Sequence, residues 1–88
     1  MRTEFLKHFY KAVEKLKSEE AKNDVADSIE NVEKALKISD IQNLKKLKGF
    51  KKTYRIKIGD YRIGLFIDGD VVQFATVEHR KDIYKYFP

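Results

Sequence analysis

Two tight-turn signals in the second half of the chain constrain its fold more than any other feature. Gly59-Asp60 and Asp68-Gly69 each suit a two-residue hairpin loop, because glycine readily adopts the positive φ angles that such loops need. Before the first turn, Tyr54, Ile56 and Ile58 alternate with polar residues, as expected of a strand with one buried face. This half of the chain therefore predicts three antiparallel strands joined by hairpins.

The first half of the chain has helical periodicity instead. Residues 2 to 6 suit a short strand, and Ser18 suits a helix N-cap because two acidic residues follow it. Apolar residues recur at helical spacing on both sides of Ser18, at Phe9, Ala12, Val13 and Leu16 and then at Val25, Ile29, Val32 and Leu36. We expect the second helix to reach about Ile38. The prediction is an α+β fold in which two N-terminal antiparallel helices pack on a small, mainly antiparallel β-sheet, with residues 1–88 as one domain.

The first hairpin places like charges opposite each other. If Ile58 pairs with Tyr61, then Lys57 lies across from Arg62, and like charges in that position weaken a sheet. Arg55 shares their face, which predicts a site for an anion. A second hairpin at Asp68-Gly69 would add His79 to this face. If Asp70 also belongs to the loop, the register slips by one residue and His79 turns inward.

Charge is unevenly distributed along the sequence. Residues 1–44 contain 8 basic and 9 acidic residues, whereas residues 45–88 contain 11 basic and 5 acidic ones. The second half therefore suits a polyanionic partner. Five lysines in an expected loop are candidate RNA-phosphate contacts, namely Lys45, Lys46, Lys48, Lys51 and Lys52.

Other features exclude several classes of protein. The chain has no cysteine, no apolar run of membrane-spanning length and no signal-peptide pattern, so we expect a soluble cytoplasmic protein without disulfides. The acidic residues nearest the basic face are Asp60, in a turn, and Glu78, on the opposite strand parity. Because metal nucleases need clustered carboxylates, we expect neither a metal ion nor another cofactor.

The sequence resembles the RelE toxins of toxin-antitoxin systems. Four segments carry the resemblance, Leu47-Lys48-Gly49-Phe50, Tyr54-Arg55-Ile56-Lys57-Ile58, Gly59-Asp60-Tyr61-Arg62 and His79-Arg80-Lys81-Asp82-Ile83-Tyr84. The resemblance implies a ribosome-dependent endoribonuclease that cuts messenger RNA in the A site, by attack of a 2′-hydroxyl on the adjacent phosphate. ParE toxins, which inhibit DNA gyrase, share this fold, so a ParE-like gyrase inhibitor and a non-catalytic RNA-binding module remain alternatives.

The resemblance also implies roles for individual residues. Arg55, Lys57 and Arg62 match basic catalytic positions on the hairpin, and Arg80 and Tyr84 match an arginine and a base-stacking tyrosine in the closing motif. Arg55 stands where well-known members have lysine, and its guanidinium stays protonated, so Lys57 is our candidate general base. The acid for the leaving group is left open between His79, Arg80 and neither.

RelE-like toxins are held inactive by small antitoxins, so the resemblance implies protein partners as well. We expect a cognate antitoxin, and a toxin-antitoxin hetero-oligomer that binds operator DNA through the antitoxin. The other expected partners are the ribosome and messenger RNA, with no role for a membrane.

Overall fold

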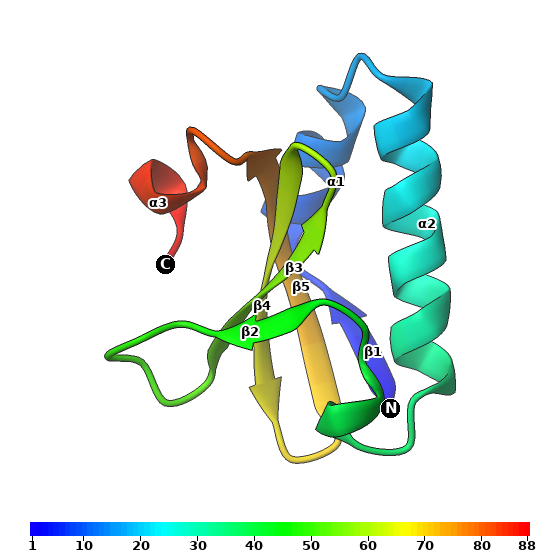
Figure 1. The fold of residues 1–88 in the computed structure, drawn as a ribbon, viewed down its shortest axis with the longest axis vertical. Helices are drawn as coiled ribbons and strands as arrows, with labels where there is room; N and C mark the ends of the chain where they lie inside the picture. The colour runs from blue at the N-terminus through cyan, green and yellow to red at the C-terminus, as the bar shows by residue number, and fades with distance from the viewer.

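A five-stranded sheet forms the centre of the computed structural model, which describes residues 1–88 (Figure 1). The strand order is β1-β5-β4-β3-β2, with β1 parallel to β5 and every other neighbouring pair antiparallel. The strands are β1 (Arg2–Phe5), β2 (Leu44–Lys46), β3 (Thr53–Ile58), β4 (Tyr61–Asp68) and β5 (Val71–His79). The predicted α+β class and the mainly antiparallel sheet are confirmed. The short strand expected at residues 2 to 6 is β1, so the two helices follow a strand and do not begin the chain.

The helices lie on both sides of this sheet. They are α1 (Lys7–Glu14), α2 (Glu19–Lys34), a 3-10 turn at Ile38–Asp40 and α3 (Ile83–Tyr86). Figure 1 shows α1 and α2 on one side and α3, with the C-terminus, on the other. We call the side covered by α1 and α2 the inner face of the sheet and the opposite side the outer face. No helix is long and apolar enough to span a membrane.

The start of α2 agrees with the sequence, and its end does not. The hydroxyl of Ser18 accepts a hydrogen bond from the backbone N–H of Ala21 at 3.1 Å, which is the predicted N-cap. The helix ends at Lys34, and Leu36, expected in its buried stripe, is 91% exposed. The carboxylate of Asp40 accepts the backbone N–H groups of Leu36 and Lys37 at 3.1 and 3.3 Å. These amides bond to a side chain instead of continuing the helix.

Two hydrophobic cores form, one on each face of the sheet. The larger core joins the inner face to α1 and α2 and includes Ile56, Ile63 and Leu65, as the alternation predicted. The smaller core lies on the outer face and consists of Leu47, Ala75, Ile83 and Phe87. The outer face is therefore partly covered by the segment that follows β5.

A β-bulge in β5 changes which residues reach the outer face. Asp68 pairs with Val71, so the loop is Gly69-Asp70, yet Val72 and Phe74 keep their predicted inward orientation. Leu65 then pairs with Phe74 whereas Gly64 pairs with Thr76, which leaves Ala75 as an extra residue. After Ala75, residues that uninterrupted alternation would place on the inner face lie on the outer face, and the reverse. Thr76 and His79 therefore do not point where the alternation predicted.

Gly64 provides space on the outer face for the ring of Phe87. A Cβ atom at Gly64 would lie 2.7 to 2.8 Å from three atoms of this ring. We expect Gly64→Ala to lower the free energy of unfolding by about 1–3 kcal/mol, as overpacking does, although alanine normally stabilises a strand relative to glycine. Urea denaturation measures this change.

A double-mutant cycle provides the control for the Gly64 substitution. In a Phe87→Ala background the clash is absent, so Gly64→Ala should cost far less there than in the wild-type background. Equal costs in both backgrounds would show that Phe87 does not occupy this space in solution.

Candidate functional site

Basic residues from three strands share the outer face. Lys57 pairs with Arg62 across the β3–β4 hairpin, as the sequence predicted, and Arg55 pairs with Gly64. On the other side of β3, Lys45 lies opposite Arg55. Lys57 is exposed, and Arg55 and Arg62 are partly buried. A row of cations therefore crosses β2, β3 and β4 beside the ring of Phe87.

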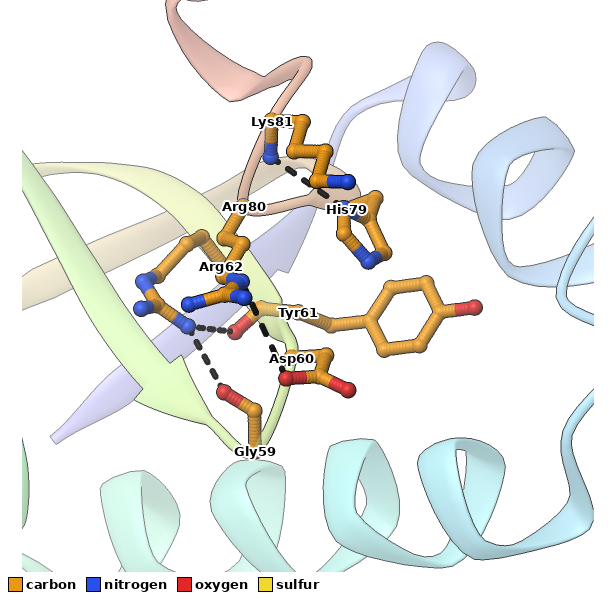
Figure 2. A network of polar contacts seen from close by, with 7 residues as sticks. All are labelled: Gly59, Asp60, Tyr61, Arg62, His79, Arg80 and Lys81. Carbon is orange, nitrogen blue, oxygen red and sulfur yellow. Dashed lines mark hydrogen bonds and ion pairs between the residues drawn. The ribbon is translucent and has the colours of Figure 1, made fainter.

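Backbone carbonyl groups hold Arg62 without neutralising its charge. The Nη1 atom of Arg62 donates to the carbonyl oxygens of Gly59 at 2.8 Å and Tyr61 at 2.9 Å (Figure 2). Arg55 contacts the carbonyl oxygen of Asn43 at 3.5 Å. Neither arginine, nor Lys57, forms an ion pair with a carboxylate. The remaining N–H groups of Arg62 can therefore bind an anion such as a phosphate.

The β3–β4 turn brings Arg80 to the same end of the sheet. The backbone N–H of Arg80 donates to the carbonyl oxygen of Asp60 at 2.7 Å, and its Nε atom lies 3.8 Å from the Asp60 carboxylate. Figure 2 shows Arg62 and Arg80 at this turn. Arg80 is more than half exposed, so its ion pair with Asp60 is weak and can open to an anion.

His79 does not join the basic face, which corrects one of our expectations. It pairs with Tyr61, and their rings meet edge to face with centroids 5.5 Å apart. Figure 2 shows both side chains pointing away from Arg62. The bulge at Ala75 causes this inversion, because it leaves Val77 in the inner core and turns His79 to the same side.

Glu78 lies on the outer face, where the predicted alternation placed His79. It pairs with Arg62, and its carboxylate accepts a hydrogen bond from the Thr76 hydroxyl at 2.6 Å. The imidazole of His8, in α1, lies 3.6 Å from the same carboxylate. Strand parity predicted that Glu78 would lie away from the basic residues, and no role was expected for His8. No glycine or proline marks the bulge. Its local sign is the change of apolar parity between Phe74 and Val77, because uninterrupted alternation would place Glu78 in the core.

A hollow of about 1000 Å³ opens between β2, the loop that follows it and the C-terminal segment. We call it the lysine hollow. It is lined by four lysines and two exposed aromatic residues, namely Lys45, Lys46, Lys48, Lys51, Phe50 and Tyr84. The structure thus brings four of the five predicted RNA-binding lysines together with the predicted stacking tyrosine. Lysines and exposed rings in one concavity suit single-stranded nucleic acid.

Two details of the lysine segment differ from expectation. Lys45 and Lys46 lie on strand β2 rather than in a loop, because they pair with Arg55 and Tyr54 of β3. Lys52 points away from the hollow and forms an ion pair with Asp68 at 2.9 Å. Among the His, Asp and Glu residues, no group of three or more is arranged to hold a metal ion.

Comparisons with known proteins show which proteins this chain resembles. A family profile described as ParE toxin of type II toxin-antitoxin system, parDE, matches residues 2–84. Toxin RelE3 of Methanocaldococcus jannaschii is 44% identical over 61 residues, which are 68% of this chain and 69% of the relative. The RelB-RelE antitoxin-toxin complex from Methanococcus jannaschii contains a chain of similar structure, with TM-score 0.77, 36% identity and coverage of 97% of this chain and 99% of that one.

A more distant solved structure shows the same fold. The intact E. coli RelBE toxin-antitoxin complex contains a chain with TM-score 0.69 and 22% identity, covering 89% of this chain and 94% of that one.

Proposed function

Because this chain belongs to the ParE toxin family of type II toxin-antitoxin systems, within the wider RelE and ParE group, we propose that it is a RelE-like toxin that cuts messenger RNA on the ribosome. The similarity to Toxin RelE3 and to a RelE chain at 36% identity supports the RelE branch. The observation that carries the proposal is the row of unpaired cations on the outer face, which continues into the lysine hollow. A protein inhibitor that acts by contact alone does not need this convergence of phosphate-binding groups.

The proposed reaction is an attack of an RNA 2′-hydroxyl on its own adjacent phosphate. The new bond joins the 2′-oxygen to phosphorus, the bond from phosphorus to the 5′-oxygen breaks, and the products are a 2′,3′-cyclic phosphate and a free 5′-hydroxyl. The 2′ proton must go to a base, and the departing oxygen must gain a proton. The phosphate oxygens carry additional charge in the transition state, which fixed cations stabilise.

Lys57 is the proposed base, and the arginines are the proposed phosphate ligands. Lys57 is exposed and directly opposite Arg62, so a phosphate bound to Arg62 would lie within reach of its amine. Arg62 is held in place by two backbone carbonyls, which limits the reorganisation needed to bind the transition state. Arg55 lies on the next outward position of β3 and Arg80 at the adjoining turn. Of the candidates for the leaving-group acid, Arg80 lies near this site, whereas His79 faces away.

The lysine hollow is the proposed site for the neighbouring nucleotides. Tyr84 is 65% exposed, so its ring is free to stack on a base, while the surrounding lysines contact phosphates. The ribosome would hold the message in position during this contact, as the RelE resemblance implies. Lys52 has a smaller proposed role because Asp68 already neutralises it.

Cell-free translation tests the proposed activity. Purified protein added to a translating extract should produce breaks in the message that primer extension maps at codon spacing, with 2′,3′-cyclic phosphate ends. The same protein should leave gyrase supercoiling unaffected. Intact message together with gyrase inhibition would favour the ParE-like alternative, whereas ribosome binding without either effect would indicate a passive RNA-binding module.

A cognate antitoxin is the proposed protein partner, because a solved structure similar to this chain is an antitoxin-toxin complex. We propose that the antitoxin covers an apolar groove between α1 and α2. The groove has a volume of about 420 Å³, and apolar or aromatic side chains dominate its lining, among them Phe5, Phe9, Tyr10, Val13, Val25 and Ile29. Tyr10 is 56% exposed there, and covering such a surface is favourable. Operator DNA would be bound through the antitoxin.

A charge introduced into the α1–α2 groove should weaken the toxin-antitoxin complex. Ala26 is exposed and lines the groove, so Ala26→Glu leaves the core intact but buries a carboxylate under the antitoxin. We expect the dissociation constant, measured by calorimetry with the antitoxin from the neighbouring gene, to rise at least about 10-fold.

The matched control for this prediction is Asn23→Glu, which adds the same charge to an exposed position of α2 outside the groove. It should bind the antitoxin as wild type does. Equal affinity for the Ala26→Glu and Asn23→Glu variants would place the antitoxin on another surface.

A further inference from the structure

A second hollow, of about 450 Å³, is lined by residues from α1 and the turn after it, from the end of β5 and from α3. We call it the histidine hollow, because it contains both histidines of the chain. Six of its lining residues can contact a polar aromatic ligand, namely His8, Lys15, Lys17, Tyr61, His79 and Tyr86. None of these residues has a role in the proposed cleavage. We infer that this hollow is a second nucleotide-binding subsite for single-stranded RNA.

The tyrosines of α3 connect the two hollows. Tyr84 lines the lysine hollow and is 65% exposed, and Tyr86 lines the histidine hollow and is 68% exposed. The short helix α3 thus presents one solvent-exposed ring to each side. The helix itself is fixed by Ile83 and Phe87, which are buried in the outer core. A base can stack on each ring, since stacking does not depend on base identity.

Two lysines of the histidine hollow are available to a phosphate, although the hollow also contains two carboxylates. Asp82 lies 3.5 Å from the ammonium of Lys85. Glu78 accepts a hydrogen bond from Thr76 at 2.6 Å and lies 3.6 Å from the imidazole of His8. Lys15 and Lys17 form no ion pair. Two free ammonium groups beside exposed aromatic rings match the backbone and bases of a single strand.

The position of this hollow suggests a path for the RNA. Arg80 precedes α3 and is bound to the β3–β4 turn beside Arg62, so the proposed cleavage site adjoins the helix that separates the hollows. A strand that occupies the lysine hollow and passes Arg62 can continue across α3 into the histidine hollow. This path rests on the proposed function, but RNA binding in the histidine hollow can be tested without cleavage.

Imidazole resonances provide a selective test of occupancy. Both histidines of the chain line this hollow, so their NMR signals report on it and not on the lysine hollow. The probe is a 2′-O-methyl oligonucleotide, which lacks the attacking hydroxyl and cannot be cleaved. Oligonucleotides of about ten residues should shift both signals at saturation, and those of about four residues should bind more weakly.

Substitutions should separate the subsite from non-specific attraction. Tyr86→Ala should weaken binding of the longer oligonucleotide by roughly 5- to 160-fold, the range for loss of one stacked base, and should remove the histidine shifts. Lys15→Ala and Lys17→Ala should each lower the salt dependence of binding by about one counterion. Lys11→Ala is the control, because Lys11 is an exposed cation of α1 outside the hollow.

Several outcomes would overturn the inference. Wild-type affinity in Tyr86→Ala, or unshifted histidine signals at saturation, would exclude the subsite even if the protein cleaves messages on ribosomes. If an acidic peptide shifted these signals and RNA did not, the hollow would be a protein contact. Conversely, Tyr86-dependent RNA binding by a protein that never cleaves would support the subsite and refute the proposed cleavage activity alone.

Discussion

Lys57→Ala should lower the rate of message cleavage by roughly 10²- to 10⁴-fold, the contribution typical of a general base. The reason is that Lys57 faces Arg62 across the hairpin, whereas the nearby Arg55 and Arg80 keep their protons. Glu78, on the other side of Arg62, already accepts a hydrogen bond from the Thr76 hydroxyl. Association with ribosomes should change little, because the lysine hollow remains intact. Single-turnover cleavage on saturated ribosomes measures the effect on chemistry separately from binding.

Two further variants make the Lys57 result specific. Lys57→Arg keeps the charge but supplies a group that cannot act as a base, so it should cleave as slowly as Lys57→Ala. Lys46→Ala removes a cation of the lysine hollow and should weaken association slightly while leaving single-turnover cleavage nearly unchanged. Wild-type cleavage by both Lys57 variants would exclude Lys57 as the base.

Arg62→Ala should lower the rate of cleavage by about 10²- to 10³-fold, as the loss of one donor to a transition-state oxyanion does. The Arg62 guanidinium is fixed by the carbonyl oxygens of Gly59 and Tyr61 and has no carboxylate partner, so its charge is available to the phosphate. The loss should appear in single-turnover rates and not in ribosome affinity.

Arg62→Lys distinguishes geometry from charge at this position. Lysine keeps the positive charge but cannot reproduce the planar pair of donors, so it should restore only part of the lost rate. Circular dichroism should show the fold of both variants unchanged, because Arg62 lies on the outer face and outside both cores. Full activity in Arg62→Ala would mean that another cation binds the transferred phosphate.

The first hairpin shows how far local sequence information reaches. A glycine at the start of a two-residue loop and the alternation on both sides of it are enough to pair Lys57 with Arg62, because each signal acts between residues close in the chain. The helix N-cap at Ser18 also depends only on residues close in the chain. The structure confirms both the pairing of Lys57 with Arg62 and this N-cap. The roles of Lys57 and Arg62 in catalysis stay predictions, which the variants at these two positions test.

Tertiary structure decided which residues of β5 join the site. The sequence indicates this only weakly, because the apolar residues change parity between Phe74 and Val77 without fixing where the extra residue lies. Ala75 forms the bulge and packs in the outer core with Leu47, Ile83 and Phe87 from distant parts of the chain. As a result of the bulge, Glu78 and not His79 lies on the outer face beside Arg62. The two hollows also depend on tertiary packing. Phe87 packs over Gly64 and thereby fixes α3, which lines both hollows. Alternation and turn residues encode contacts between neighbours in sequence, whereas the bulge and the docking of α3 depend on the free energy of burying side chains that meet only in the folded protein.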